Sequence, residues 1–245
     1  MAYDARPTRP SRHESAARST CSACPVARPC PAEYSRDPAG SMLSLPHAGK
    51  VLFGEDTPAF ALYVVRAGCL KTVTCDADGK EHVRGFHFPD DMVGLDALGA
   101  ASYPSSAIAV TPSQVCRISK GKLQQMFSTA PEQVQRLLEC TSRALRKSLA
   151  LSGDYTAEQR VAAFLVEMEA RLAEGSGGEF ELPMTRRDVA NHLRLATETV
   201  CRVLGRFAEN GWLRSGCVLQ IKRHAELWEL ARPVEGGRMP TRLAA

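Results

Sequence analysis

Short apolar runs separated by turn residues occupy the chain from residue 50 to residue 119. Runs of this length at regular spacing are typical of strands in an antiparallel barrel or roll. The Asp78-Gly79 pair between two of the runs fits a hairpin turn, because both residues tolerate positive φ angles. The pattern therefore predicts an antiparallel β-roll, whose clearest strands are expected at residues 61–65, 70–74 and 83–88.

The spacing becomes helical after Pro131, which is a favourable first residue of a helix. The following residues recur every three or four positions and so share one face: Val134, Leu138, Thr141, Leu145 and Leu149. This predicts a long helix over about 131–152 that ends near Gly153. A second helix is expected over 156–173, closed by the glycines at 175–178.

Two shorter helices are expected next. Thr185 and Asp188 are spaced almost as in a capping box, so a helix should begin there. A second helix over 197–210 buries Val200, Val203, Leu204 and Phe207 and presents Glu198, Cys201 and Arg202 on its opposite face. This spacing indicates a helix-turn-helix, and residues 212–221 are expected to form a wing.

Arg194 stands at the turn position where Gly is usual. It costs about 1 kcal/mol if that position must be left-handed.

Composition limits the class of protein. With 245 residues, 44% hydrophobic and 24% charged, the chain is too apolar to be wholly disordered and long enough for one or two domains. The net charge is only +4, but residues 184–223 carry eight basic side chains against three acidic ones, which suggests a local nucleic-acid surface. No apolar stretch reaches the length of a membrane helix, and the first 20 residues lack a secretory signal, so we expect a cytoplasmic protein.

Nine cysteines in such a chain are expected to be metal ligands, reactive thiols or core residues. Cys21, Cys24 and Cys30 form a Cys-x2-Cys-x5-Cys cluster that provides three ligands of a metal site. Zinc and an iron-sulfur cluster both fit this spacing. The spacing does not choose a fourth ligand among the other six cysteines, and the alternative role for those cysteines is packing.

The order of β-roll, long helix and winged helix-turn-helix resembles the catabolite activator and FNR (fumarate and nitrate reduction regulator) family. The FNR branch is indicated by matching residues that span nearly everything from Cys21 to Leu230: the cysteine cluster, residues 85–87 and 91–96, Cys116, residues 157–164 and residues 184–207. The resemblance implies an α+β fold and an oxygen-responsive transcription regulator of anaerobic or low-oxygen gene expression.

The resemblance also implies an oxygen-labile [4Fe-4S] cluster held by Cys21, Cys24, Cys30 and Cys116. Strand alternation puts Cys116 and Ile118 on one face, where core packing is the alternative role of Cys116. A homodimer is expected through the five-residue face of the long helix, with RNA polymerase as a further partner.

Each subunit of such a dimer should place one recognition helix in the major groove of an inverted repeat similar to TTGAT-N4-ATCAA. Arg202 is assigned to guanine and Glu198 to cytosine, and Thr199 and Arg206 to phosphates. The remaining expected DNA contacts are Arg186, Thr197 and Cys201, of which Cys201 replaces the family's serine.

The expected domain order follows from these assignments. It comprises a disordered tail over 1–20, a cluster loop and β-roll over 21–130, a dimerisation helix over 131–153, a winged helix-turn-helix over 154–232 and a second disordered tail over 233–245.

Three alternatives remain open at this point. A cyclic-nucleotide sensor of the same architecture is disfavoured, because residues 94–106 contain no arginine for a phosphate. A cupin-like metalloenzyme would use His47, His82 and His87. A zinc-stabilised interaction protein would use the cysteine cluster alone.

Overall fold

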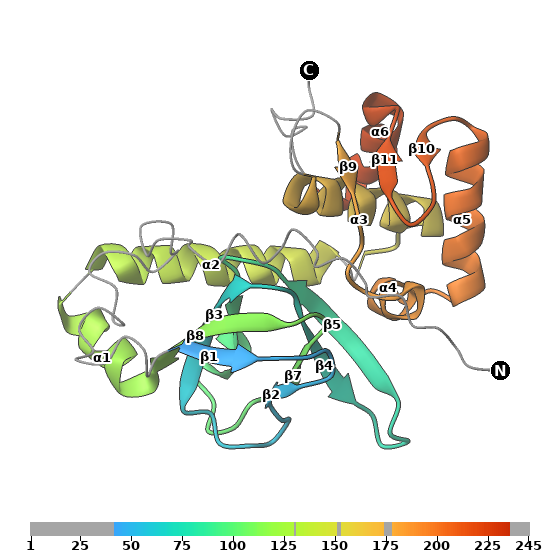
Figure 1. Cartoon of the computed structure of the whole chain (residues 1–245). Helices are drawn as coiled ribbons and strands as arrows, with labels where there is room; N and C mark the ends of the chain where they lie inside the picture. The colour runs from blue at the N-terminus through green and yellow to red at the C-terminus, as the bar shows by residue number, and fades with distance from the viewer. Residues whose placement is uncertain (1–41, 130, 151–152, 174–177, 236–245) are drawn as a thin grey trace. The chain divides into compact units, whose positions relative to one another are not determined.

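The structure is a computed structural model that describes residues 42–129, 131–150, 153–173 and 178–235 (Figure 1). The chain divides into two compact units. The first consists of Met1–Lys71 and Phe86–Leu137, and the second of Thr72–Gly85 and Leu138–Ala245. Cys21, Cys24, Cys30 and the expected tail over 1–20 lie outside the described residues.

Two four-stranded sheets form the expected β-roll. The first has the order β1 (Met42–Leu45), β8 (Ser113–Ser119), β3 (Ala61–Ala67) and β6 (Met92–Val93), and its neighbouring strands are antiparallel. The second has the order β2 (Val51–Phe53), β7 (Ser106–Ala109), β4 (Leu70–Cys75) and β5 (Glu81–His87). Side chains from both sheets share one apolar core, so the sheets pack face to face.

An aromatic stack lies within this core. The rings of Phe53 and Tyr103 are stacked with centroids 3.8 Å apart, and the Tyr103 hydroxyl donates a hydrogen bond to the Ala61 carbonyl at 2.6 Å. Burial raises the pKa of Tyr103 to about 12, so its hydroxyl remains a donor at neutral pH. Tyr103 therefore ties the segment before β7 to strand β3.

The predicted hairpin turn is confirmed between β4 and β5. Asp76 accepts hydrogen bonds at Oδ1 from the backbone amides of Asp78 and Lys80, and Gly79 adopts a positive φ of 76°. A hydrogen bond from His82 lowers the pKa of Asp76, which stays ionised as the acceptor of the turn.

Helix α2 (Pro131–Ala150) confirms the long helix, although its expected last residues, 151 and 152, lie outside the described part. The preceding helix α1 (Lys120–Thr129) was not expected, and the short 3-10 helix η4 (Leu95–Ala97) follows β6. Helix α3 (Ala157–Leu172) begins with a capping box between Thr156 and Gln159.

The C-terminal helix-turn-helix consists of α4 (Arg186–Leu193) and α5 (Thr197–Glu209). A small sheet of β10 (Leu213–Arg214), β11 (Leu219–Ile221) and β9 (Glu179–Phe180) forms the wing. The last helix, α6 (His224–Glu235), corrects the expected start of the tail at residue 233, since burial of Val234 stabilises a final turn despite Pro233. Within the described residues, no helix is both long and apolar enough to cross a membrane.

Candidate nucleic-acid interface and sensor site

The first helix of the helix-turn-helix is fixed at both ends. The Asp188 amide donates to Thr185 Oγ1 at 3.1 Å and the Thr185 amide to Asp188 Oδ2 at 3.3 Å, which confirms the expected capping box. At the other end, Arg194 has φ 56° and ψ 44°, so the turn position is left-handed as its glycine preference requires. The strain of about 1 kcal/mol foreseen for a non-glycine residue is therefore present.

Helix α5 presents its two faces as the sequence predicts. Val200, Val203, Leu204 and Phe207 are buried against the module, and Glu198, Cys201 and Arg202 are exposed. Thr197 and Thr199 lie in the first turn and are partly exposed. The exposed residues therefore project from the helix end that reads bases in helix-turn-helix proteins.

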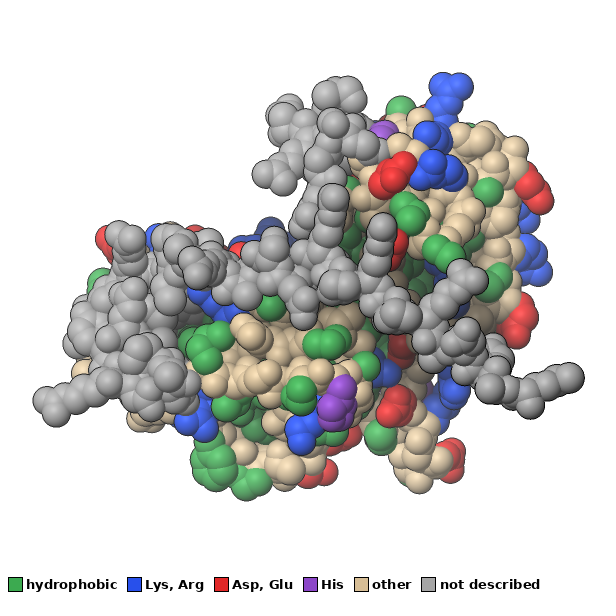
Figure 2. Space-filling model, viewed as in Figure 1, with side chains coloured by type: hydrophobic (Ala, Val, Ile, Leu, Met, Phe, Trp, Pro, Cys, Tyr) green, Lys and Arg blue, Asp and Glu red, His purple; other side chains and the backbone are tan. Residues whose placement is uncertain are grey.

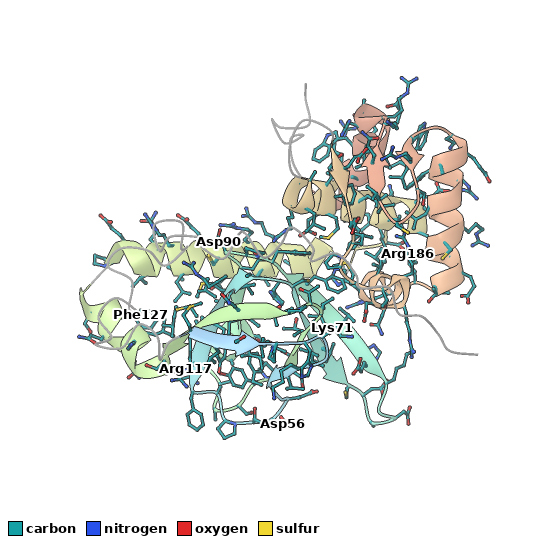
Figure 3. The ribbon with its side chains drawn as sticks, in the orientation of Figure 1. Asp56, Lys71, Asp90, Arg117, Phe127 and Arg186 are labelled. Atoms are coloured by element: carbon teal, nitrogen blue, oxygen red, sulfur yellow. The ribbon has the colours of Figure 1, made fainter. Side chains whose placement is uncertain are left out.

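Some basic residues of this module form ion pairs within the chain, and others do not. Among the described residues, Glu198 and Arg202 form no ion pair with each other, although they lie one turn apart on α5. Arg206 instead binds Glu158 of α3, and Arg214 Nη2 lies 2.6 Å from Glu179 Oε1. Figure 2 shows Lys and Arg side chains on the surface of this module, interspersed with Asp and Glu, and Arg186 lies at the start of α4 (Figure 3).

Arg160 connects α3 to the helix-turn-helix, a role that no local pattern indicated. Its guanidinium donates to the carbonyls of Tyr155, Leu193 and Gly153 at 3.1, 3.2 and 3.1 Å. The Leu193 carbonyl belongs to the last turn of α4, where backbone carbonyls have no hydrogen-bond donor within the helix. Arg160 therefore holds α4 in place while it satisfies one of these carbonyls.

Asn191 of α4 makes a second long-range connection that the sequence did not reveal. Its Nδ2 donates to the Glu81 carbonyl and its Oδ1 accepts from the Val83 amide, both at 2.7 Å. The side-chain amide thus pairs with β5 as a neighbouring strand would. The hairpin of residues 72–85 therefore belongs to the same compact unit as α4.

His192 is buried beside this connection and tilts against the Phe164 ring at 6.2 Å. The pKa of His192 is lowered to about 4, mainly by burial and also by the nearby charges of Lys147 and Arg194. Glu167 and a hydrogen bond with the Val83 backbone oppose this shift. His192 is consequently neutral at physiological pH.

Cys116 occupies the middle of the first sheet of the roll. It lies opposite Met42 of β1 on one side and Val64 of β3 on the other. Val115 belongs to the roll core, so Cys116 and Ile118 lie together on the other face, as alternation predicted, and both are buried. Arg117 between them is exposed (Figure 3).

Strand β1, the first described strand, pairs with β8 beside Cys116. Met42, the register partner of Cys116, comes twelve residues after Cys30. Twelve residues span at most about 40 Å when extended, and directly opposed residues of antiparallel strands have Cα atoms about 5 Å apart. The first described strand therefore begins directly beside Cys116, and the chain length from Cys30 to Met42 is compatible with a shared ligand set.

Helix α2 exposes most of its expected seam. Leu138, Leu145 and Leu149 are 64%, 59% and 61% exposed, whereas Val134 and Thr141 are partly buried. Large apolar side chains at this spacing on an exposed face are typical of a helix that packs against a second copy.

The histidines of the cupin-like alternative do not come together. Within the described residues, no group of three His, Cys, Asp or Glu side chains is arranged to hold a metal, and His47, His82 and His87 are all described. His47 contacts the Ala48 carbonyl and His82 contacts Asp76. These three histidines therefore do not form the metal site that the cupin-like alternative requires.

The remaining cysteines divide by exposure. Cys69 is buried in the roll, as packing predicts, and Cys140 is partly buried. Cys75 and Cys217 are exposed, so a packing role for these two is wrong.

Comparison with known proteins finds a family domain in each half of the chain. The Cyclic nucleotide-binding domain model matches residues 47–130, and the Crp-like helix-turn-helix domain model matches residues 159–230. The chain is similar to the Transcriptional activator protein Anr of Pseudomonas aeruginosa, with 36% identity over 75% of this chain and 78% of that protein. It is 35% identical to the Fumarate and nitrate reduction regulatory protein of Escherichia coli over 75% of this chain and 76% of that protein.

Among solved structures, FixK2 from Bradyrhizobium japonicum is similar with a TM-score of 0.70 and 30% identity, over 77% of this chain and 96% of that one. A CRP/FNR-family regulator from Thermus thermophilus, TTHA1359, has a TM-score of 0.62 and 25% identity, over 78% and 98% of the two chains. The similarity extends through both the β-roll and the helix-turn-helix.

Proposed function

The chain belongs to the CRP/FNR family of transcription regulators, and from this premise we propose that it is an oxygen-responsive activator that holds a [4Fe-4S] cluster. Family membership makes it a DNA-binding regulator and not an enzyme. The proposal adds Cys21, Cys24, Cys30 and Cys116 as ligands, a TTGAT-N4-ATCAA-like inverted repeat as operator, RNA polymerase as partner and the cytoplasm as compartment.

The position of Cys116 carries this proposal. A ligand set that joins the N-terminal cluster to β8 needs a buried thiol where the chain enters the roll, and Cys116 is 8% exposed and paired in register with Met42. Buried sulfur beside an apolar sheet face suits cluster ligation, because exclusion of solvent is one determinant of cluster potential. The three other thiols lie outside the described residues.

When bound, the cluster would supply an oxygen-labile centre that links the cysteine loop to β8. The chain's own part is to hold one thiolate rigidly on a central strand and to bring the other three to it. Cluster ligation by Cys30 and Cys116 would fix both ends of the segment that contains β1. It would therefore stabilise the pairing of β1 with β8. We propose that this stabilisation favours the dimer formed through α2.

The α2 surface supports a dimer of modest strength. The exposed leucines Leu138, Leu145 and Leu149 supply apolar contact, while Thr141 interrupts them. Lys147 is 2.6 Å from Glu167 of α3, so one of the cations of α2 is neutralised within its own chain. Dimerisation through such an interface is weak, because few apolar side chains contribute to it. A structural change near the start of α2 can therefore shift the equilibrium between monomer and dimer.

A cyclic-nucleotide sensor is the second candidate, supported by the domain model that matches residues 47–130. In the segment that would contact a nucleotide, polar side chains already interact within the protein. Tyr103 is buried, and the Ser105 hydroxyl donates to Asp96 Oδ2 at 3.0 Å. The segment 94–106 has no Lys or Arg to bind the phosphate. We therefore favour the iron-sulfur proposal.

Metal analysis of protein purified without oxygen tests the proposal. We expect about four iron and four sulfide per chain and a broad visible absorbance that oxygen bleaches. A colourless protein with one zinc per chain would contradict the proposal and favour the zinc-stabilised alternative. Tight binding of a cyclic nucleotide by iron-free protein would favour the second candidate.

A further inference from the structure

Arg194 is the one described non-glycine residue with a left-handed backbone in the helix-turn-helix. A glycine would adopt φ 56° and ψ 44° without steric penalty, so an arginine there is strained. Its backbone amide donates to the carbonyls of Ala190 and Asn191, but a glycine amide would do the same. The backbone therefore gives no reason for this side chain.

Within the part of the module that the structure describes, the Arg194 side chain also has no partner. Arg194 is exposed, and among the described residues its guanidinium makes no ion pair or hydrogen bond. Arg160, Arg206 and Arg214 differ in this respect, because each binds oxygen atoms of its own chain. Arg194 can therefore bind a partner outside the chain without first breaking an internal interaction.

The position in the turn indicates what this partner is. Arg194 precedes the N-cap of the recognition helix, Ala196, by two residues. When the first turns of such a helix enter the major groove, the adjoining turn lies near the groove edge, where the phosphates are. The exposed cations Arg187 and Arg202 and the partly exposed Arg186 stand on the same two helices, so the local charge favours an anionic partner.

We propose that Arg194 is a DNA-phosphate contact, and that the chain keeps a strained arginine in the turn for this contact. The inference deepens the DNA-binding part of the proposed function and does not depend on the iron-sulfur cluster. It adds a sequence-independent contact in each subunit, at a site where glycine would give a more relaxed fold. Stability and DNA affinity are therefore opposed at this position.

Three variants of the full chain test the proposal: Arg194→Gly, Arg194→Asn and Arg194→Lys. Glycine relieves the strain and removes the charge, asparagine tolerates the left-handed backbone without charge, and lysine keeps both charge and strain. We expect Arg194→Gly to raise Tm by about 2–4 °C. A lower Tm would show that the side chain stabilises the fold, and would overturn the proposal.

DNA affinity is measured for each variant from 50 to 200 mM salt, on a duplex with the inverted repeat and on a scrambled duplex. For Arg194→Gly and Arg194→Asn we expect affinity to fall about three- to tenfold on both duplexes, and the salt slope to shrink by about 0.9 for each phosphate that is no longer neutralised. Arg194→Lys should keep most of the slope. An unchanged slope in the glycine and asparagine variants would overturn the proposal.

Failure of the proposed operator would look different. The unmodified protein would then bind both duplexes with equal affinity, while the difference in slope between the unmodified protein and Arg194→Gly would remain measurable on either duplex.

Discussion

The helix-turn-helix and the sensor roll assemble their candidate residues in opposite ways. The seven expected DNA contacts all lie between Arg186 and Arg206, on two consecutive helices. The four expected cluster ligands extend from Cys21 to Cys116, and the approach of Met42 to Cys116 depends on pairing of β1 with β8. Local helix geometry therefore brings the residues of the first site together, although distant contacts hold α4 in place, whereas the second site requires the roll to be complete.

Removal of Cys116 should have the largest effect, because it takes one expected ligand out of a site that the whole roll assembles. We expect Cys116→Ala to lose nearly all cluster iron and the visible absorbance, because three thiolates leave one iron without a protein ligand. Cys69→Ala is the matched control, since Cys69 is also a buried cysteine of the roll and its sulfur contacts the Leu70 carbonyl. Equal iron content in the two variants would remove Cys116 from the ligand set.

An acidic residue on the exposed seam of α2 should have the next largest effect. We expect Leu145→Asp to weaken dimerisation on the order of 100-fold or more, because apolar burial is lost in both subunits and two like charges meet. Sedimentation of cluster-loaded protein measures this. Arg143→Asp, on the opposite side of the same helix, is the control, and equal dissociation by both variants would place the interface elsewhere.

Arg202 and Arg206 lie one turn apart on α5 but have different surroundings, so their removal should have different effects on DNA binding. Arg202 has no partner among the described residues, while Arg206 must exchange Glu158 for a phosphate. We expect Arg202→Ala to weaken the free energy of operator binding by about 1–3 kcal/mol and to relax selectivity at one base pair. Arg206→Ala should weaken all sequences alike and by less. A uniform loss for Arg202→Ala would contradict base readout by this residue.

A smaller effect, on the free energy of unfolding, is expected when the pH is lowered. His192 has a pKa of about 4 when folded, against its ordinary value near 6.5 when unfolded. The unfolded chain thus binds the extra proton between these values, so stability is unaffected above pH 6.5 and falls as the pH drops toward 4. Compared with His192→Phe, the unmodified protein should lose about 1–2 kcal/mol more between pH 7.5 and pH 5. Denaturant unfolding measures this, and parallel pH profiles would contradict it.

The local signals of the sequence were sufficient for most of the fold. The period of the helices, the capping box at Thr185 and the turn at Asp76 all depend on neighbours within a few residues. Helix α1 and the end of α6 were missed, because packing against the rest of the chain decides short or proline-containing helices.

The contacts that hold the candidate site in place were not predictable in the same way. Asn191 pairs with Glu81 and Val83, more than a hundred residues earlier, and nothing near Asn191 in the sequence indicates that partner. Arg160 reaches Leu193 in a similar manner. The exposed face of α5 was predictable because a helix specifies its own faces, and the surroundings of Cys116 were not, beyond strand alternation.

In the proposed function, the state of the cysteine site controls DNA binding by the helix-turn-helix. The most direct test measures operator binding by one anaerobic sample before and after exposure to oxygen, together with its iron content. We predict that affinity for the inverted repeat falls in proportion to the loss of cluster iron, while nonspecific binding changes far less. Equal operator affinity for cluster-loaded and cluster-free protein would contradict the account.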